Sequence, residues 1–268
     1  MKLFLSKPFQ EIWKDKDPFE EVEKLEGEVY RELAGRKTLR FTLAGKNYFV
    51  KIHHGVGLLE MIKNILCFRL PVWGAFNEFS AIRRLESLGI DTMKIAGFGR
   101  RGFNPASQKS FIITEELMNT ISLEDYGEKW RKQRPDFRMK YILIKNIADI
   151  SRRMHDNGIN HRDYYLCHFL LDLSTVNRPD LVKLFLIDLH RAQVRGITPV
   201  RWRLKDIASL YFSTMTFGLT QRDCFRFMRC YSGKTLKECI ADQDGFWRAV
   251  ESQGRKLWQR KLRKGDAI

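Results

Sequence analysis

Two short apolar runs near the middle of the chain, His168–Leu173 and Val182–Ile187, have the length and composition of buried β-strands. The segment between them contains the letters NRPD, which are typical of a turn. If the two runs pair as a hairpin, the start of the first lies beside the end of the second. The pattern therefore predicts that Asp163, His168 and Asp188 meet at one end of this hairpin.

The N-terminal part predicts a small sheet. From Gly27 to Ile52 the pattern indicates three short strands, and a tight turn with the letters AGKN connects the last two. The third strand ends with Lys51 between two β-branched residues. Thr92–Phe98 and Ser110–Thr114 add two strands, so we expect a five-stranded sheet preceded by an irregular lead-in over residues 1–26.

Two helices interrupt these strands. An apolar stripe with helical spacing predicts a helix over residues 55–70, and a second helix is predicted from about Ala75 to Leu88. On the second helix Glu78 shares a face with Ile82 and Leu85, so its carboxylate is expected to point inward.

After Thr114 the pattern becomes mostly helical. A long amphipathic helix is predicted from Arg138 to His155, and further helices follow Arg203. The predicted fold class is therefore α+β and bilobal. We expect a β-rich N-lobe over residues 27–117 and a mainly helical C-lobe over residues 118–268.

The charge balance narrows the choice of partner. The chain has 48 basic and 32 acidic residues, a net charge of +16, so an anionic partner is expected, either nucleic acid, an anionic membrane face or a phosphorylated substrate. Five cysteines without a Cys-x-x-Cys pair are typical of reduced thiols. We found neither a signal peptide nor an apolar run of the ~20 residues that cross a bilayer. We therefore expect a soluble or peripheral protein.

The order of these features resembles the protein-kinase-like fold. The resemblance implies that Lys51 contacts the phosphates of ATP and that Glu78 pairs with this lysine. It further implies a catalytic loop over residues 160–168, in which Asp163 orients the acceptor hydroxyl group, and a metal-binding loop over residues 188–191. Such chemistry needs a hard oxygen ligand for Mg²⁺, which Asp188 offers. Lys51, Glu78, Asp163 and Asp188 occur in the order found in kinases. Chance is a poor explanation for all four matches.

The chain departs from the kinase pattern at the phosphate-binding loop. The segment from Arg31 to Lys37 has one glycine, and either Arg36 or Lys37 holds phosphate there or the segment is an ordinary hairpin turn. Glu115 and Leu117, near the boundary between the lobes, are also expected to contact ATP.

The predicted catalytic and metal-binding loops depart from the kinase pattern at two further places. His168 stands where kinases have an asparagine as second metal ligand, and an imidazole is a softer donor. The letters DLH replace DFG, which removes the glycine of a switchable loop.

The segment after Asp188 indicates the kind of acceptor. Asp206 follows about 18 positions later, which leaves little room for the segment on which protein substrates dock. A small-molecule or glycan acceptor is therefore favoured. A cluster of cations follows the two catalytic loops, and it is either a solvated basic face or a site for a negatively charged acceptor: Arg162, Arg191, Arg195, Arg201, Arg203.

The strings NHRDYYLCHFLL and LIDLHRA make the resemblance more specific. They are similar to the lipopolysaccharide core heptose(I) kinases of Gram-negative bacteria, in which His168 is the expected residue. This resemblance implies phosphorylation of the first inner-core heptose at O4, with ATP and Mg²⁺ as cofactors. The protein would be cytoplasmic, peripheral on the inner face of the inner membrane, with nascent lipopolysaccharide as its acceptor.

Three alternatives stay open. Other small-molecule or protein kinases of the same fold are the nearest, and a catalytically inactive basic binding module is the third. Nucleic acid is not an expected partner, because the chain has no recognisable nucleic-acid motif. The apolar helix 55–70 either packs in the lobe or binds a partner, and the family resemblance suggests acyl carrier protein or an acyl chain. The basic C-terminal helix either packs in the C-lobe or lies on anionic lipid.

Overall fold

The computed structural model describes residues 1–33, 35–55, 74–102, 108–131, 133, 136–241 and 245–265. Its backbone forms two compact units. Unit 1 comprises Met1–Arg84, Thr92–Met118 and Leu189–Arg191, and unit 2 comprises Leu85–Asp91, Asn119–Asp188 and Ala192–Ile268. The apolar helix predicted over residues 55–70 falls almost wholly on positions that lie outside the described residues.

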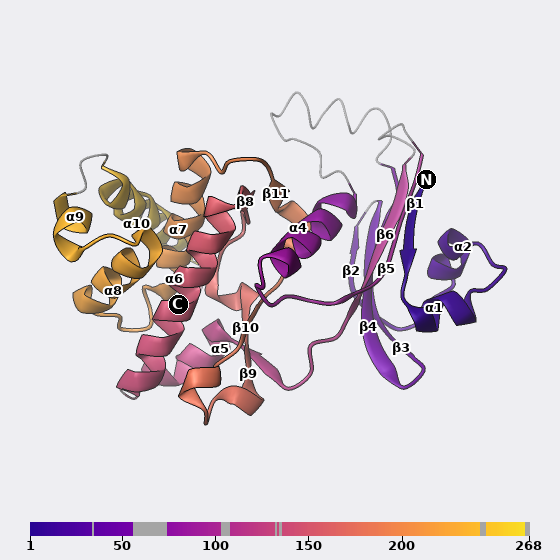
Figure 1. Ribbon diagram of the computed structural model, residues 1–268, viewed down its shortest axis with the longest axis horizontal. Coiled ribbons are helices and arrows are strands. Elements are labelled where there is room, and N and C mark those ends of the chain that lie inside the picture. The colour runs from indigo at the N-terminus through magenta and orange to yellow at the C-terminus, as the bar shows by residue number, and fades with distance from the viewer. Residues whose placement is uncertain are drawn as a thin grey trace. The chain divides into compact units, whose positions relative to one another are not determined.

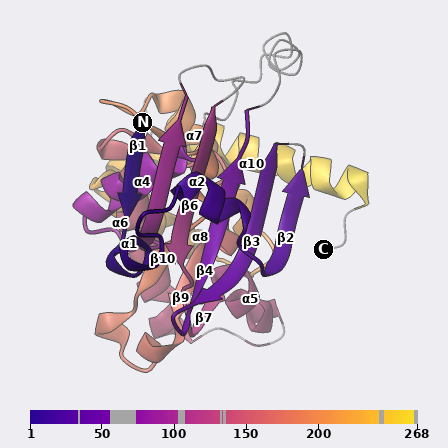
Figure 2. The same cartoon turned by 90° about the vertical axis from the view of Figure 1, so that its right-hand side faces the viewer.

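Unit 1 is built on an antiparallel sheet of six strands in the order β1-β5-β6-β4-β3-β2 (Figure 2). The strands are β1 (Lys2–Leu5), β2 (Glu28–Leu33), β3 (Arg36–Leu43), β4 (Lys46–His53), β5 (Ile95–Arg101) and β6 (Lys109–Glu115). The five strands predicted from the sequence are present, and β1 adds a sixth at the edge beside β5.

The prediction that residues 1–26 form an irregular lead-in is wrong. This segment forms β1 and two short helices, α1 (Lys7–Ile12) and α2 (Pro18–Glu23), which lie on one face of the sheet (Figure 1). Their buried aromatic side chains, Phe9 and Trp13 among them, belong to the same apolar core as Val50. Elements of four to six residues are too short to show a hydrophobic period, so the scattered aromatics gave no signal.

Helix α4 (Phe76–Ser87) covers the other face of the sheet in unit 1 (Figure 1). Its Phe79 ring stacks on Phe98 of β5 with ring centroids 4.0 Å apart. Ile82 is fully buried, and Glu78 is 99% buried on the same side of the helix. The prediction that the Glu78 carboxylate points inward is confirmed.

Unit 2 is mainly helical. Its α-helices are α5 (Leu123–Glu128), α6 (Phe137–Asp156), α7 (Val200–Thr214), α8 (Gln221–Ser232), α9 (Leu236–Ala241) and α10 (Phe246–Lys264). Its strands are β7 (Thr120–Ser122), β8 (Ile159–Asn160), β9 (Phe169–Asp172), β10 (Leu184–Leu186) and β11 (Gln193–Val194). Strand β9 lies between β10 and β7, and β8 pairs with β11. A sheet-rich N-terminal part and a helical C-terminal part confirm the α+β fold class.

The predicted hairpin is present in unit 2. Strands β9 and β10 pair antiparallel, with Phe169 opposite Leu186. One position beyond this pair, the backbone N–H of Ile187 donates to the carbonyl oxygen of His168 at 3.0 Å. The start of the first apolar run therefore lies beside the end of the second, as the sequence predicted.

The long helix predicted from Arg138 to His155 is also present, as α6. An aspartate at the N-cap, Asp136, accepts a hydrogen bond from the backbone N–H of Met139 and fixes where the helix begins. Met154 and Ala148 are fully buried along its inner face, so α6 supplies much of the apolar core of unit 2.

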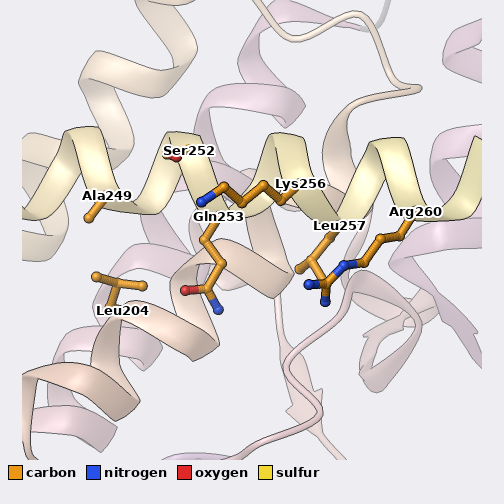
Figure 3. Close-up of a pocket in the computed structure, with 7 residues that line it drawn as sticks. All are labelled: Leu204, Ala249, Ser252, Gln253, Lys256, Leu257 and Arg260. Atoms are coloured by element: carbon orange, nitrogen blue, oxygen red, sulfur yellow. The ribbon is translucent and has the colours of Figure 1, made fainter.

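A pocket of about 400 Å³ lies on unit 2 along α10, where Leu204 of α7 forms the opposite wall (Figure 3). The α10 residues that line it are Ala249, Ser252, Gln253, Lys256, Leu257 and Arg260. The lining mixes apolar and basic side chains and contains no carboxylate, so this pocket lacks the groups that phosphoryl transfer requires. None of the described helices is long and apolar enough to cross a membrane.

The four cysteines that the structure describes are free thiols: Cys167, Cys224, Cys230 and Cys239. Burial raises the pKa of Cys167 to about 12 and also raises the pKa of Cys224. Both therefore stay protonated at neutral pH and behave as packed side chains rather than nucleophiles.

Candidate active site

The first part of the site is an ion pair inside unit 1. Lys51 alternates along β4 with the buried Val50 and Ile52, so its side chain points to the sheet face that α4 covers. Its Nζ lies 2.7 Å from Oε1 of Glu78, whose side chain is 1% exposed. Glu78 is in the first turn of α4, where the positive end of the helix dipole favours a carboxylate. The pair holds one ammonium group in a fixed position.

The second part is the end of the β9–β10 hairpin in unit 2. The His168 ring lies between two aspartates: its Nδ1 is 2.6 Å from the backbone oxygen of Asp163, and its Nε2 is 3.5 Å from Oδ2 of Asp188. The three residues meet as the sequence pattern predicted. A carbonyl oxygen can only accept, so Nδ1 carries a proton, and Nε2 is the ring nitrogen directed at Asp188.

This donor set suits a divalent cation that keeps other ligands. A carboxylate oxygen of Asp188 and the Nε2 atom of His168 face each other at 3.5 Å. Mg²⁺ is commonly bound by one or two carboxylates together with substrate phosphates and water. Among the described residues no group of three or more His, Cys, Asp or Glu side chains converges on one point. Asp188 and His168 could supply two of the ligands of such an ion, although the imidazole is a softer donor than Mg²⁺ prefers.

The backbone is strained on both sides of this site. Arg162 and Asp188 have φ angles of +75° and +59°, in the left-handed region that non-glycine residues seldom adopt. Such conformations persist only where the surrounding structure enforces them, and they concentrate at functional sites.

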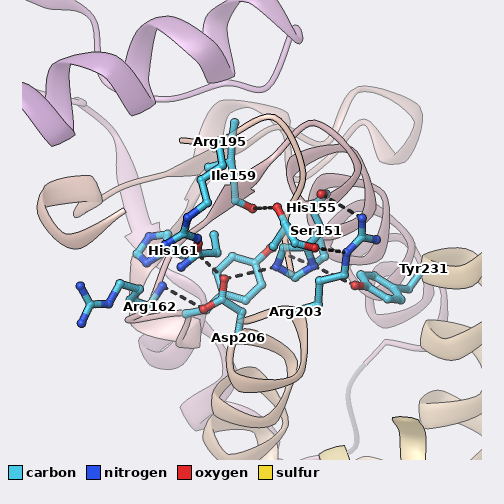
Figure 4. A network of polar contacts seen from close by, with 12 residues as sticks. Ser151, His155, Ile159, His161, Arg162, Arg195, Arg203, Asp206 and Tyr231 are labelled. Carbon is cyan, nitrogen blue, oxygen red and sulfur yellow. Dashed lines mark hydrogen bonds and ion pairs between the residues drawn. The ribbon is translucent and has the colours of Figure 1, made fainter. Parts of the chain in front are cut away.

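Asp206 of α7 holds the strained loop in place (Figure 4). This carboxylate is fully buried and accepts hydrogen bonds from the backbone N–H groups of His161, at 2.7 Å, and Arg162, at 2.9 Å. His155 Nε2 lies 3.2 Å from the same carboxylate, and the other ring nitrogen is 2.8 Å from the hydroxyl oxygen of Tyr231. Asp206 thereby fixes the backbone that carries Asp163.

This role of Asp206 was not predicted from the sequence, in which the residue marked only the length of the segment after Asp188. A signal was present, because Asp206 directly precedes the mainly apolar letters IASL in a segment predicted to be helical. Positions 206–210 are all buried, and a buried carboxylate must be hydrogen-bonded.

His161 is a neutral packing residue beneath the site. Its Nε2 lies 2.9 Å from the carbonyl oxygen of Ile187, and its ring stacks on that of His168 with centroids 5.7 Å apart. Burial lowers the pKa of His161, so the ring is uncharged at neutral pH. It supports the His168 ring from one side.

The predicted acceptor-binding cations separate into different environments. Arg203 binds Asp156 at 2.7 Å and the carbonyl oxygen of His155 at 3.1 Å, so it ties α7 to the end of α6. Arg195 donates to the side-chain oxygens of Asn160 and Gln193. Two others, Arg162 and Arg201, lie against the ring of Trp202. Arg191 belongs to unit 1.

The other predicted ATP contacts lie on unit 1. Arg36 and Lys37 are the first residues of β3, where they pair with Leu33 and Glu32 of β2. Glu115 ends β6 opposite Tyr48, and Leu117 follows in the connector.

Comparison with known proteins decides the family. The sequence model of the Lipopolysaccharide kinase (Kdo/WaaP) family matches residues 20–231 of the chain. The chain belongs to this family.

Curated relatives match over almost their full length. "Lipopolysaccharide core heptose(I) kinase WaaP" of Escherichia coli is 51% identical over 97% of this chain and 98% of that protein. The protein of the same name from Pseudomonas aeruginosa is 48% identical over 100% of both chains. A solved structure, "WaaP in complex with acyl carrier protein", has a TM-score of 0.85 and 45% identity, and the match covers 96% of this chain and 100% of that one.

Membership in the Kdo/WaaP family makes the protein a kinase, a phosphotransferase that uses ATP. Two features described above carry groups that a kinase needs. They are the fixed ammonium group in unit 1 and the two aspartates with an imidazole in unit 2. Both are described within their own units, and each provides groups that phosphoryl transfer requires.

Proposed function

We propose that this protein transfers the γ-phosphoryl group of ATP to O4 of the first heptose of the lipopolysaccharide inner core. The observation that carries the proposal is the similarity of the entire chain, at about half of its positions, to relatives named core heptose(I) kinases. The residues that the chemistry needs are present at the expected places, and this supports an active enzyme of the same kind.

Each residue of the proposed mechanism has one task. Lys51, held by Glu78, contacts the phosphates of ATP and neutralises part of their charge. Asp163 accepts a hydrogen bond from the heptose hydroxyl group, orients it toward the γ-phosphorus and takes its proton as the new P–O bond forms. The bond between the γ-phosphorus and the bridging oxygen breaks, and ADP leaves with that oxygen.

Asp188 and His168 are the residues that would hold Mg²⁺, since their oxygen and nitrogen atoms face each other at the hairpin end. When bound, the ion supplies charge neutralisation for the β- and γ-phosphates. Arg36, Lys37, Glu115 and Leu117 are further proposed ATP contacts, and Arg162, Arg191, Arg195 and Arg201 are proposed acceptor contacts. Arg203 is proposed instead as a positioning residue, because Asp156 and two carbonyl oxygens occupy its guanidinium.

An acceptor panel tests the proposal. The protein is incubated with ATP and Mg²⁺ together with core lipopolysaccharide lacking heptose phosphate, with a general protein substrate, or with no acceptor. We expect phosphate transfer to the glycan fraction alone. Phosphate on protein in the same assay would favour a protein kinase, and ATP binding without transfer to any acceptor would favour an inactive binding module.

Acyl carrier protein is a proposed partner. The similar solved structure is of a complex with acyl carrier protein, and an acidic partner would complement a chain with a net charge of +16. The apolar segment 55–70 is the proposed contact, although it lies outside the described residues. Native mass spectrometry of the chain mixed with purified acyl carrier protein tests this: a stable heterodimer is expected, and only free chains at high concentration would refute it.

We also propose that the protein works at the cytoplasmic face of the inner membrane as a peripheral protein. The C-terminal turns of α10 carry Lys261, Arg263 and Lys264, and Leu262 is 47% exposed among them. Cations flanking an exposed apolar residue are suited to anionic lipid headgroups. Co-sedimentation with phosphatidylglycerol vesicles is expected at low salt and should fall steeply as salt rises; equal binding to neutral vesicles would contradict the idea.

A further inference from the structure

Trp202 is the centre of a dense group of positive charges in unit 2. Four cationic side chains lie over its ring, with the charged group between 4.6 and 5.7 Å from the ring centroid: Arg162, Arg195, Arg201 and Lys205. We call this group the Trp202 cluster. Cation–π contacts at exposed sites are individually weak, and they do not explain why four cations gather at one ring.

The electrostatics of the cluster are unfavourable in three ways. Arg201 and Lys205 are four positions apart on α7, so two like charges share one helix face. The first turn of α7 has no acidic residue, so the positive end of the helix dipole adds to these charges. Burial, and the charge of Arg201, lower the pKa of Arg195. Each of these costs would be relieved by one anion.

For Arg195, Arg201 and Lys205, the described side chains do not supply that anion. Arg201 and Lys205 form no ion pair with a residue in the part of the chain that the structure covers. Arg195 has only neutral amide oxygens as hydrogen-bond acceptors, those of Asn160 and Gln193. The indole N–H of Trp202 is also buried without an acceptor among the described atoms, and a buried donor of this kind requires an explanation.

One member of the Trp202 cluster is next in sequence to the residue proposed to orient the acceptor hydroxyl. Arg162 directly precedes Asp163, and Figure 4 shows its side chain directed away from Asp206 while its backbone N–H is bound to that carboxylate. An anionic group bound by Arg162 would be held by the residue that directly precedes Asp163, whose carboxylate is proposed to orient the accepting hydroxyl.

We propose that the Trp202 cluster is an acceptor subsite that binds a carboxylate or phosphate group carried by the same glycan as the accepting hydroxyl. This inference rests on the proposed function. The subsite favours acceptors that are already acidic beside the phosphorylation point, and it positions the hydroxyl at Asp163. Arg203 is excluded from the subsite, because its guanidinium donates to Asp156 and to the carbonyl oxygens of Thr198 and His155.

The test compares two double variants of the full chain. Arg201→Ala with Lys205→Ala removes two exposed cations of the cluster, and Arg222→Ala with Lys237→Ala removes two exposed cations of α8 and α9 as a matched control. Because both cations are exposed and partly screened by solvent, we expect the acceptor KM of the first variant to rise roughly 10- to 100-fold. The KM for ATP should stay at the control value.

Two modified acceptors identify the anion. In one the glycan carboxylates are reduced to alcohols, and in the other the lipid phosphates are removed. The KM ratio between variant and wild type should fall close to one with whichever acceptor lacks the recognised group. An unchanged ratio with both acceptors, an acceptor KM equal to that of the control, or a rise confined to the KM for ATP would overturn the proposal.

Failure of the proposed function can be distinguished from failure of the subsite proposal. If wild-type protein transfers no phosphate to heptose, the proposed function is wrong, and acceptor binding measured by calorimetry still compares the two variants. Weaker binding by the Arg201/Lys205 variant alone would support the subsite, and equal binding by both variants would refute it.

Discussion

Single residues determine the chemistry of this protein, and the ion pair of Lys51 and Glu78 shows how. The Glu78 carboxylate is almost completely buried, and Lys51 Nζ at 2.7 Å compensates its charge. In return, the carboxylate keeps the ammonium group in one position inside unit 1. Removing one partner of such a pair costs far more than removing both.

Lys51→Met is therefore expected to lower kcat/KM by roughly 10²- to 10³-fold, the range seen when one preorganised charge-stabilising group is removed. It should also destabilise the fold, because Glu78 loses its counter-charge. Adding Glu78→Gln should restore the urea unfolding midpoint but leave activity low. Lys46→Met, at the exposed start of the same strand, is the control; equal loss of activity in this control would argue against a specific role for Lys51.

His168 gives a second expectation at this scale. Its Nδ1 is committed to the carbonyl oxygen of Asp163, which leaves Nε2 directed at Asp188. His168→Ala should lower activity by roughly 10- to 100-fold and raise the Mg²⁺ concentration needed for half-maximal rate. His168→Asn should retain more activity than the alanine variant. An alanine variant with an unchanged Mg²⁺ requirement would show that this ring has no part in binding the ion.

His53 makes stability depend on pH. Burial, reinforced by the charges of Arg36 and Lys51, lowers the pKa of this histidine to about 3, whereas an unfolded histidine has a pKa of about 6.5. Between these values the unfolded chain binds a proton that the folded chain does not. The stability contributed by neutral His53 is complete above pH 6.5 and is lost as pH falls.

Between pH 7 and pH 5 this histidine should cost about 2 kcal/mol of unfolding free energy. His53→Gln removes the titrating group, so the variant should lose correspondingly less stability over the same range. Urea unfolding of both proteins at the two pH values measures the difference. Parallel pH profiles would mean that His53 is protonated in the folded protein as easily as in the unfolded one.

At the scale of secondary-structure elements, short antiparallel ribbons position the residues proposed for catalysis and binding. The β9–β10 hairpin brings His168 and Asp188 together, and the two-residue pair of β8 and β11 places Arg195 beside the catalytic loop. The first was predictable, because two apolar runs with turn chemistry between them have a clear pattern. The second was not, since strands of two residues have no hydrophobic period and depend on tertiary contacts.

Gly158 shows why the β8–β11 ribbon tolerates no side chain at its start. Its φ is +80°, and an added Cβ would lie 1.8 Å from the carbonyl oxygen of Arg195. Gly158→Ala should therefore lower the unfolding free energy by about 2–4 kcal/mol. Gly196→Ala is the matched control, because a Cβ there would meet nothing within 4 Å. Thermal unfolding of both variants measures this, and equal stabilities would contradict the described backbone contact.

At the scale of the whole molecule, the order of residues along the chain was more informative than any single motif. Lys51, an inward Glu78, Asp163 and Asp188 predicted a kinase because each was on the expected element. The sequence indicated that Asp206 is buried, but its task of holding the loop could not be predicted, because this depends on hydrogen bonds from the backbone N–H groups of His161 and Arg162. The basic segment was predicted as one acceptor site, but Arg203 is bound within the fold while four other cations surround Trp202.

The position of the new phosphate tests the central claim most directly. Core lipopolysaccharide lacking heptose phosphate is incubated with ATP, Mg²⁺ and the protein, and phosphorus–proton correlation NMR of the released core oligosaccharide locates the phosphate. We predict one phosphate on O4 of the first heptose with the wild-type chain, and none with Asp163→Ala, which should still bind ATP. Phosphate on another sugar, or the same product from Asp163→Ala, would contradict the account.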